Sequence, residues 1–196
     1  MGKVRGTSVL GTLEFLRTTF GEERTGGLIR SLPLPLRDAL GGDAITVQPQ
    51  GWYECAALCA LTREADRQLG KGDLELARAM GRHVAFSDVN RFFRWLLKLT
   101  GPRTVFSRAA SVWNNYYDTG TYVLEEVTDR CASLRIEGWD SADEVLCRRI
   151  EGWVARGCEL TLGEGTHPRV RETHHQARDP QVSKHLFCRF VAEWGD

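Results

Sequence analysis

Apolar residues recur at intervals of three and four through the N-terminal half of the chain, the spacing typical of helices packed on one face. This pattern predicts a helix over residues 7–19, followed by two short helices in TGGLIRSLPLPLRDALGG that its prolines separate. The stretch VQPQGWYECAALCALTREADRQLG predicts a turn and then a long amphipathic helix. One or two helices are expected over residues 73–101, and a last one over residues 103–117.

After Gly120 the pattern changes to the alternation typical of strands. TYVLEEVTDRCASLRIEGW predicts two short strands around a Thr-Asp turn. SADEVLCRRIEGWVARG predicts a helix that begins with a capping box of Ser141 and Glu144 and ends at Gly157. Two more strands are expected over residues 168–194, and the last of them has one apolar face.

Together these elements predict an α+β fold in a single domain that covers residues 1–196. Its first part is an N-terminal helical layer, residues 1–119, and its second part is a C-terminal ββαββ antiparallel sheet, residues 120–196. A chain of this length buries about 70% of its unfolded surface, so folding requires neither disulfides nor a metal ion.

Composition narrows the possible partners. The chain has 26 Lys and Arg residues against 26 Asp and Glu residues, and this balance predicts no nucleic-acid partner. No segment approaches the length of apolar sequence that spans a bilayer, so membrane insertion is not expected. The first residues lack the apolar core of a signal peptide, and we therefore expect a cytoplasmic location with reduced cysteines.

The most unusual stretch is SVWNNYYDTGTY, residues 111–122, where aromatic residues surround two asparagines and a glycine. Trp113 shares one helical face with Tyr116 or Tyr117, since these positions lie three and four residues apart. One interpretation is a joint that clamps the last helix to the first strand. The other is the wall of a ligand cavity at the same place, and the two interpretations overlap.

Catalytic and metal-binding patterns are absent from the sequence. His174 and His185 flank the last hairpin. Glu172 shares a strand face with His174, and from that face both side chains can approach His185 or Cys188 across the hairpin. Their separation does not fit a compact set of ligands, and no metal site is predicted. His83 is expected at a helix end, and no serine has the glycine elbow of a hydrolase. We therefore predict no catalytic residues and no cofactor.

Five stretches carry a resemblance to known proteins: RGTSVLGTLEFL, GWYECAALCAL, RFFRWLLKL, WNNYYDTG and HLFCRFVAEW. Through them nearly the whole chain resembles an uncharacterised family of roughly two-hundred-residue proteins, expanded into many paralogues in the myxobacterial lineage. That family is similar to a superfamily that contains haem nitric-oxide-binding domains, four-vinyl-reductase-type domains and the Bet-type subunits of vesicle-tethering complexes. These motifs are structural rather than catalytic.

The resemblance implies a cavity between the helical layer and the sheet, and by analogy a homodimer. In the haem branch a histidine on the helix before the first hairpin binds the iron. Here Trp113 stands at about that place, residues 103–122 contain no histidine, and the Tyr-x-Ser-x-Arg signature of that branch is missing. Haem binding by that route is therefore not expected.

Three functional hypotheses follow, in order of preference. The first is a non-enzymatic sensor or signalling adaptor that encloses a small apolar ligand and passes its state to a protein partner or a second copy. The second is a ligand-free interaction scaffold, and the third is a haem- or metal-dependent sensor or enzyme. The residues expected to line the cavity are Trp52, Tyr53, Phe92, Trp95, Trp113 and Tyr117.

Overall fold

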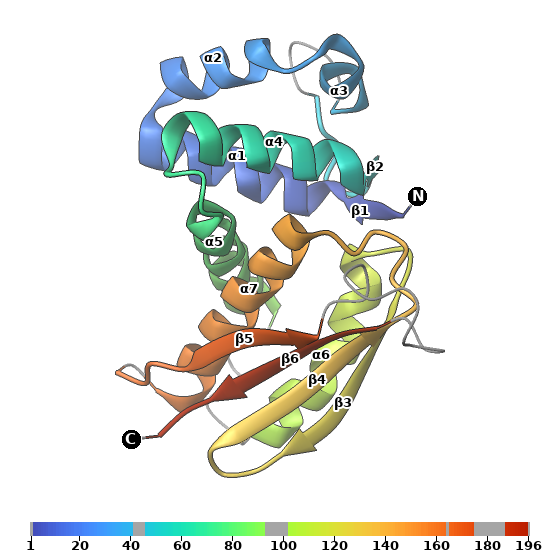
Figure 1. Ribbon diagram of the computed structural model, residues 1–196, viewed down its shortest axis with the longest axis vertical. Coiled ribbons are helices and arrows are strands. Elements are labelled where there is room, and N and C mark those ends of the chain that lie inside the picture. Colours follow the sequence, from blue (N-terminus) through green and yellow to red (C-terminus); the bar gives the residue numbers. More distant parts are fainter. Residues whose placement is uncertain (1, 41–45, 93–101, 164, 175–186, 196) are drawn as a thin grey trace.

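The structure, a computed structural model, describes residues 2–40, 46–92, 102–163, 165–174 and 187–195. The expected α+β order is confirmed: helices come first along the chain, and a ββαββ unit follows (Figure 1). No helix among these residues is long and apolar enough to cross a membrane.

Four helices form the N-terminal end of the molecule (Figure 1). They are α1 (Gly6–Phe20), α2 (Glu22–Ser31), α3 (Leu34–Ala39) and α4 (Cys55–Leu69). Their buried leucines and valines form one side of the core. A small antiparallel pair of strands, β1 (Lys3–Arg5) and β2 (Trp52–Glu54), ties the start of α1 to the start of α4. The sequence did not predict this pair, because strands of three residues are too short to show alternation.

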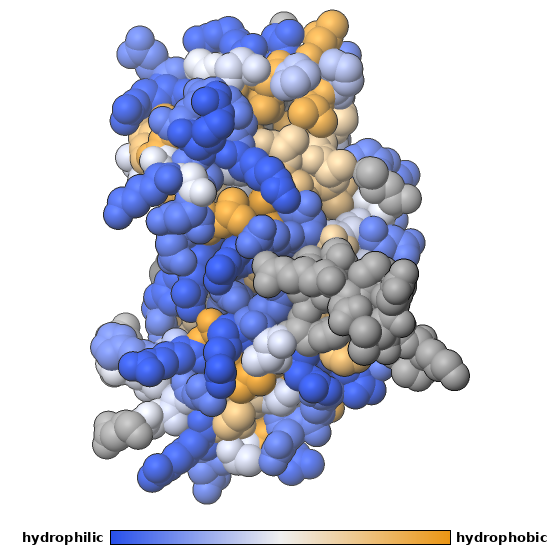
Figure 2. All heavy atoms as spheres, viewed as in Figure 1, coloured by the Kyte–Doolittle hydropathy of each residue, from blue (hydrophilic) through white to orange (hydrophobic). Residues whose placement is uncertain are grey.

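On the face shown in Figure 2 hydrophilic residues dominate the surface, and hydrophobic ones gather at the end of the molecule that carries α3. Leu34, the first residue of α3, is 58% exposed.

The other three helices lie beside the sheet (Figure 1). They are α5 (Glu75–Phe92), α6 (Pro102–Tyr116) and α7 (Glu144–Leu162). The helix expected over residues 73–101 is α5 as far as Phe92, and residues 93–101 lie outside the described part. Two expectations for α7 were wrong. Asp143, not Ser141, caps the helix by accepting a hydrogen bond from the backbone N–H of Val145, and the helix runs through Gly157 to end at Gly163.

Helices α5 and α7 approach closely because each has a glycine at the crossing. A β-carbon on Gly81 would lie 2.0 Å from the carbonyl oxygen of Arg149, and one on Gly152 would lie 2.0 Å from that of Arg78. Only the missing side chains allow the two backbones to touch, and this contact fixes where Arg149 enters the interior.

The sheet has the strand order β3-β4-β6-β5 and is antiparallel throughout. Its strands are β3 (Thr121–Val127), β4 (Cys131–Glu137), β5 (Arg169–His174) and β6 (Phe187–Glu193). The predicted alternation of β6 is confirmed, since Cys188, Phe190 and Ala192 are all buried. Helices α6 and α7 cover this inner face, and no described helix covers the other, open face (Figure 1).

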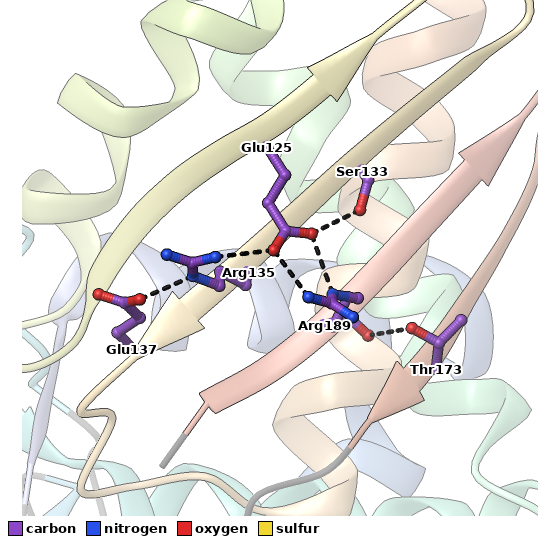
Figure 3. A network of polar contacts seen from close by, with 6 residues as sticks. All are labelled: Glu125, Ser133, Arg135, Glu137, Thr173 and Arg189. Carbon is purple, nitrogen blue, oxygen red and sulfur yellow. Dashed lines mark hydrogen bonds and ion pairs between the residues drawn. The ribbon is translucent and has the colours of Figure 1, made fainter. Parts of the chain in front are cut away.

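The open face carries a network of charged side chains (Figure 3). Glu125 on β3 accepts hydrogen bonds from Ser133 (2.7 Å), Arg135 (2.9 Å) and Arg189 (2.9 Å), which come from β4 and β6. The register shifts between Leu124 and Glu126, so Glu125 is the extra residue of a β-bulge. Partial burial alone would raise the pKa of Glu125, but these hydrogen bonds together lower it.

Candidate functional site

A cavity of about 60 Å³ lies between the helices and the inner face of the sheet. Helices α1, α5, α6 and α7 contribute to its wall, together with β3 and β4. Most of the wall is apolar and includes Val84, Val112, Leu134 and Ile150. The wall residues with polar side-chain groups are Ser8, two tryptophans, three tyrosines and Arg149.

Trp113 and Tyr117 bring the WNNYYDTG stretch into the cavity wall. Their rings stack with centroids 4.3 Å apart, and both meet the buried ring of Trp139 edge-on at 5.1 and 5.3 Å. The indole N–H of Trp113 donates to the carbonyl oxygens of Thr119 (3.2 Å) and Gly120 (3.0 Å), where α6 turns into β3. The stretch is thus both the joint between helix and sheet and part of the cavity wall.

Arg149 of α7 is the unexpected member of the wall. It is only 4% exposed, and its side-chain nitrogen Nη1 lies 3.5 Å from the sulfur of Met80. Within the described part of the chain, no carboxylate lies within ion-pair distance of its guanidinium. Burial lowers the pKa of Arg149, whereas the nearby Tyr117 and Cys59 side chains raise it. A buried cation without an anion is costly, so this arrangement indicates a place for a negative charge.

Tyr117 is the group in the wall best placed to supply that charge. Burial raises the pKa of its phenol, and the positive charge of Arg149 opposes this rise. Tyr122, opposite Ile136 in the sheet, also lines the cavity. Burial raises its pKa as well, and its hydroxyl has no hydrogen-bond partner within the described residues. The cavity wall therefore combines three tyrosines and one arginine with mostly apolar residues.

Of the six residues expected to line the cavity, the structure brings two together, Trp113 and Tyr117. Trp52 is not a cavity residue: it is 39% exposed on β2, and the guanidinium of Arg5 lies 3.9 Å from its ring centroid. Tyr53 lies near the start of α1, where its hydroxyl accepts a hydrogen bond from the backbone N–H of Gln48 at 2.8 Å. Phe92 ends α5 with its side chain outside the described part, as is all of Trp95.

Sequence reasoning missed Arg149 and Tyr122. An arginine in a helix with charges of both signs is expected to be exposed to solvent. Arg149 is buried where α7 crosses α5 at their glycines. Tyr122 lies on β3, where residues 122–125 are all half-buried, so no alternation marks it as a residue that faces the cavity.

His83 contributes nothing to the cavity. It lies within α5 rather than at a helix end, its ring meets Phe15 edge-on, and its Nε2 lies 3.8 Å from a carboxylate oxygen of Glu14.

No protein-family model matches the chain, and no curated protein matches it in sequence. Solved structures do. The unliganded Fe(II) H-NOX protein of K. algicida superposes with a TM-score of 0.69 at 13% identity, over 98% of this chain and 97% of that one. The H-NOX protein of S. oneidensis in its Fe(II)NO state has a TM-score of 0.70 at 10% identity, over 98% and 99%. The fold is that of the H-NOX domains. A third H-NOX structure, from work on haem distortion, gives 0.67 at 10% identity, over 98% and 95%.

The H-NOX likeness corrects the order of the functional hypotheses. The sensor or adaptor for a small apolar ligand came first from sequence, and the ligand-free scaffold second. Two of the structures that share this fold over nearly their whole length are described through their haem, and others through an Fe(II) centre. The likeness contradicts both preferred hypotheses and matches the third, which was placed last.

The residues of the cavity fit haem in donor chemistry but not in volume. No histidine lines the cavity among the described residues, yet tyrosine is an established haem ligand. The 60 Å³ present is far below the roughly 300–1,000 Å³ of pockets that hold larger ligands. Ser133 and Arg135 keep the Ser-x-Arg part of the haem-branch signature, but their side chains bind Glu125 on the open face of the sheet (Figure 3).

Proposed function

We propose that the protein is a haem-dependent sensor domain in which Tyr117 is the iron ligand and Arg149 neutralises its phenolate. The observation that carries the proposal is the buried guanidinium of Arg149, without a carboxylate partner among the described residues, inside a cavity of an H-NOX fold.

The proposal follows from the charge of the cavity. A lone cation in an apolar interior is stabilised by any anion that forms beside it. Burial raises the pKa of the Tyr117 phenol and so favours its neutral form, and the nearby positive charge of Arg149 opposes this rise. When haem is bound, Tyr117 would hold the ferric iron through its phenol oxygen, with the phenol proton released to solvent, and Arg149 would neutralise the negative charge of that oxygen. When bound, haem would supply an iron centre able to bind a diatomic gas.

Haem binding in this chain requires the aromatic joint to open. The rings of Trp113 and Tyr117 now pack against Trp139, where they fill space between the layers. Movement of these two rings away from Trp139 would enlarge the cavity. The opening therefore links occupancy of the site to the joint between α6 and β3, which gives a sensor its means of signalling.

The proposal is of a binding domain and not of an enzyme. Among the residues that the structure describes, no serine or cysteine stands beside a histidine in the manner of an activated nucleophile. Two finer expectations are kept as proposals beside it: membership of the myxobacterial paralogous family, and a cytoplasmic protein that forms a homodimer. Light scattering with and without haemin tests the dimer.

The test is a titration of the purified protein with haemin, followed by absorbance. We expect one haem per chain, with the charge-transfer absorption of a ferric phenolate and its Fe–O stretch in resonance Raman spectra. Tyr117→Phe should remove the phenolate signature, and Arg149→Met should weaken binding by about 10- to 100-fold, as is usual for groups that support a metal ligand.

Tyr122→Phe is the matched control, because it removes another hydroxyl from the same wall. It should leave the phenolate signature intact. A wild-type protein that is folded but gives no haem spectrum at stoichiometric haemin contradicts the proposal. A histidine-type spectrum that persists in Tyr117→Phe contradicts the assignment of the ligand.

A further inference from the structure

The guanidinium of Arg149 lacks the partners that its chemistry calls for. It carries five N–H donors, yet among the described residues its hydrogen-bond partner is the sulfur of Met80, at 3.5 Å. A thioether is a weak acceptor without charge. Arg149 is 4% exposed and lines the cavity, so acceptors for its other donors have to come from inside the cavity. Water there would accept hydrogen bonds but would leave the buried charge without a counter-ion.

The hydroxyl of Tyr117 is a second donor in the same wall. It forms no hydrogen bond with another described residue. Burial raises the pKa of this phenol, so it keeps its proton in the haem-free protein. Tyr117 lies near enough to Arg149 for each side chain to shift the pKa of the other. The two side chains can therefore donate to one and the same anion.

The start of α1 adds to the positive potential of the cavity. Ser8 lines the cavity, is 5% exposed and lies in the first turn of this helix of 15 residues. The positive end of a helix dipole favours an anion nearby. This contribution acts in the same direction as the charge of Arg149.

The size and the wall of the cavity limit which anion fits. At roughly 10–15 Å³ for each water-sized group, its 60 Å³ has room for about four to six such groups. One guanidinium balances a single negative charge, and its planar fork matches two oxygens that lie in one plane. The mostly apolar wall disfavours strongly hydrated anions such as sulfate and phosphate, whose transfer from water is costly.

We propose that the haem-free protein binds a small planar anion of single charge in this cavity, held by Arg149 and the Tyr117 hydroxyl. A short-chain carboxylate of the size of acetate has this chemistry, and so does nitrate. The ligand is recognised by its charge, unlike the apolar ligand first expected from the sequence.

The role of the anion rests on the proposed function, because haem is proposed to use the same two side chains. The anion and haem then exclude each other from the cavity. The anion stabilises the closed aromatic joint, and its concentration sets how much haem the domain needs before it responds. Anion binding itself is measured in the haem-free protein, without reference to haem.

The test is calorimetric titration of the haem-free, full-length protein with sodium acetate and, separately, with sodium nitrate. The buffer contains gluconate as its anion, which is too large for the cavity. We expect saturable binding of one anion per chain, and at ten times Kd a rise in Tm of about 3–6 °C. Sulfate at the same ionic strength should give neither effect.

Arg149→Met should weaken acetate binding by about 100-fold or more, because it removes the counter-charge and two charge-assisted hydrogen bonds. Tyr117→Phe should weaken it by about tenfold, through the loss of one hydrogen bond. Arg148→Met is the matched control: it removes the same charge from the neighbouring position on α7, where the guanidinium already pairs with Glu151 at 3.0 Å. It should bind acetate as wild type does.

The proposal is overturned if the folded wild type binds neither anion, or if Arg149→Met binds acetate as tightly as wild type. Binding of acetate alone would identify a carboxylate as the ligand, and binding of both anions would show that the planar shape and single charge suffice. Acetate at ten times its Kd should lower the apparent affinity for haemin about tenfold. Unchanged affinity would overturn the competition, whereas failure of haemin to bind without acetate would contradict the proposed function and leave the anion results standing.

Discussion

Replacement of Arg149 by methionine should make the protein more stable while it weakens haem binding. Methionine keeps much of the length of the side chain and its contact with Met80, but it removes the buried charge. Arg149 is 4% exposed and has no carboxylate partner in the described part of the chain. Buried ionic groups replaced by apolar residues of similar volume typically increase the free energy of unfolding by about 1–4 kcal/mol.

The increase should be visible in any two-state unfolding experiment. For a chain of this size each kcal/mol shifts Tm by about 2–4 °C. The matched control is Arg148→Met, the neighbouring residue on α7. Arg148 forms an ion pair with the buried carboxylate of Glu151 at 3.0 Å, and its loss should lower the free energy of unfolding by about 1 kcal/mol or more. In urea unfolding at neutral pH, the free energy of unfolding should therefore increase for Arg149→Met and decrease for Arg148→Met.

Two results would refute this reasoning. If Arg149→Met lowers the free energy of unfolding by more than about 1 kcal/mol, the guanidinium is stabilised in the haem-free protein and needs no ligand anion. If the variant gains stability but binds haemin as tightly as wild type, the cost of burial is real and Arg149 has no part in binding. A gain in stability with a loss of affinity is the pattern of a residue kept for function.

The remaining predictions concern packing and pH. Gly152→Ala should lower the free energy of unfolding by about 1–3 kcal/mol or more, because the new β-carbon would meet the carbonyl oxygen of Arg78. Gly157→Ala on the same helix should raise the free energy of unfolding by about 0.5–1 kcal/mol, because the space around Gly157 is open. Urea unfolding of both checks this pair, and equal effects would contradict the close crossing. Because hydrogen bonds lower the pKa of Glu125, its contribution to stability is complete above the ordinary value of 4.5 and is lost as pH falls through the lowered pKa. Glu125→Gln should remove this part of the pH dependence and cost about 1–3 kcal/mol at neutral pH, whereas the exposed Glu126→Gln should change neither.

The sequence predicted the fold well because the fold depends on periodicity. The alternation of β6, the turn between β3 and β4 and the order of the helices all follow from patterns within a single element. The misses at both ends of α7 have a common cause. Ser141 is a suitable residue to cap the start of α7, but Asp143 does so instead. Gly157 is a suitable residue to end the helix, but α7 continues past it while it packs against α5.

The candidate site was predicted only where it lies within one segment. Trp113 lies in the last turn of α6 and Tyr117 directly follows that helix, four residues later, so the spacing alone predicted that their side chains meet. Arg149 enters the cavity through the crossing of two helices. Such contacts join residues from different elements, and the spacing of residues along the chain does not predict them.

The packing of the aromatic joint determines how strongly haem would have to bind to open the cavity. Moving an aromatic ring such as that of Trp113 out of its packed position exposes up to roughly 200 Å² of surface, which costs at most about 5 kcal/mol. A closed form favoured by that amount lowers the apparent affinity by at most three to four orders of magnitude, at about 1.4 kcal/mol for each factor of ten. The closed cavity is therefore compatible with a haem protein only if the bond to iron exceeds this cost. Arg149, which has no carboxylate partner among the described residues, would reduce this cost, because an anion bound beside it would offset its unfavourable burial.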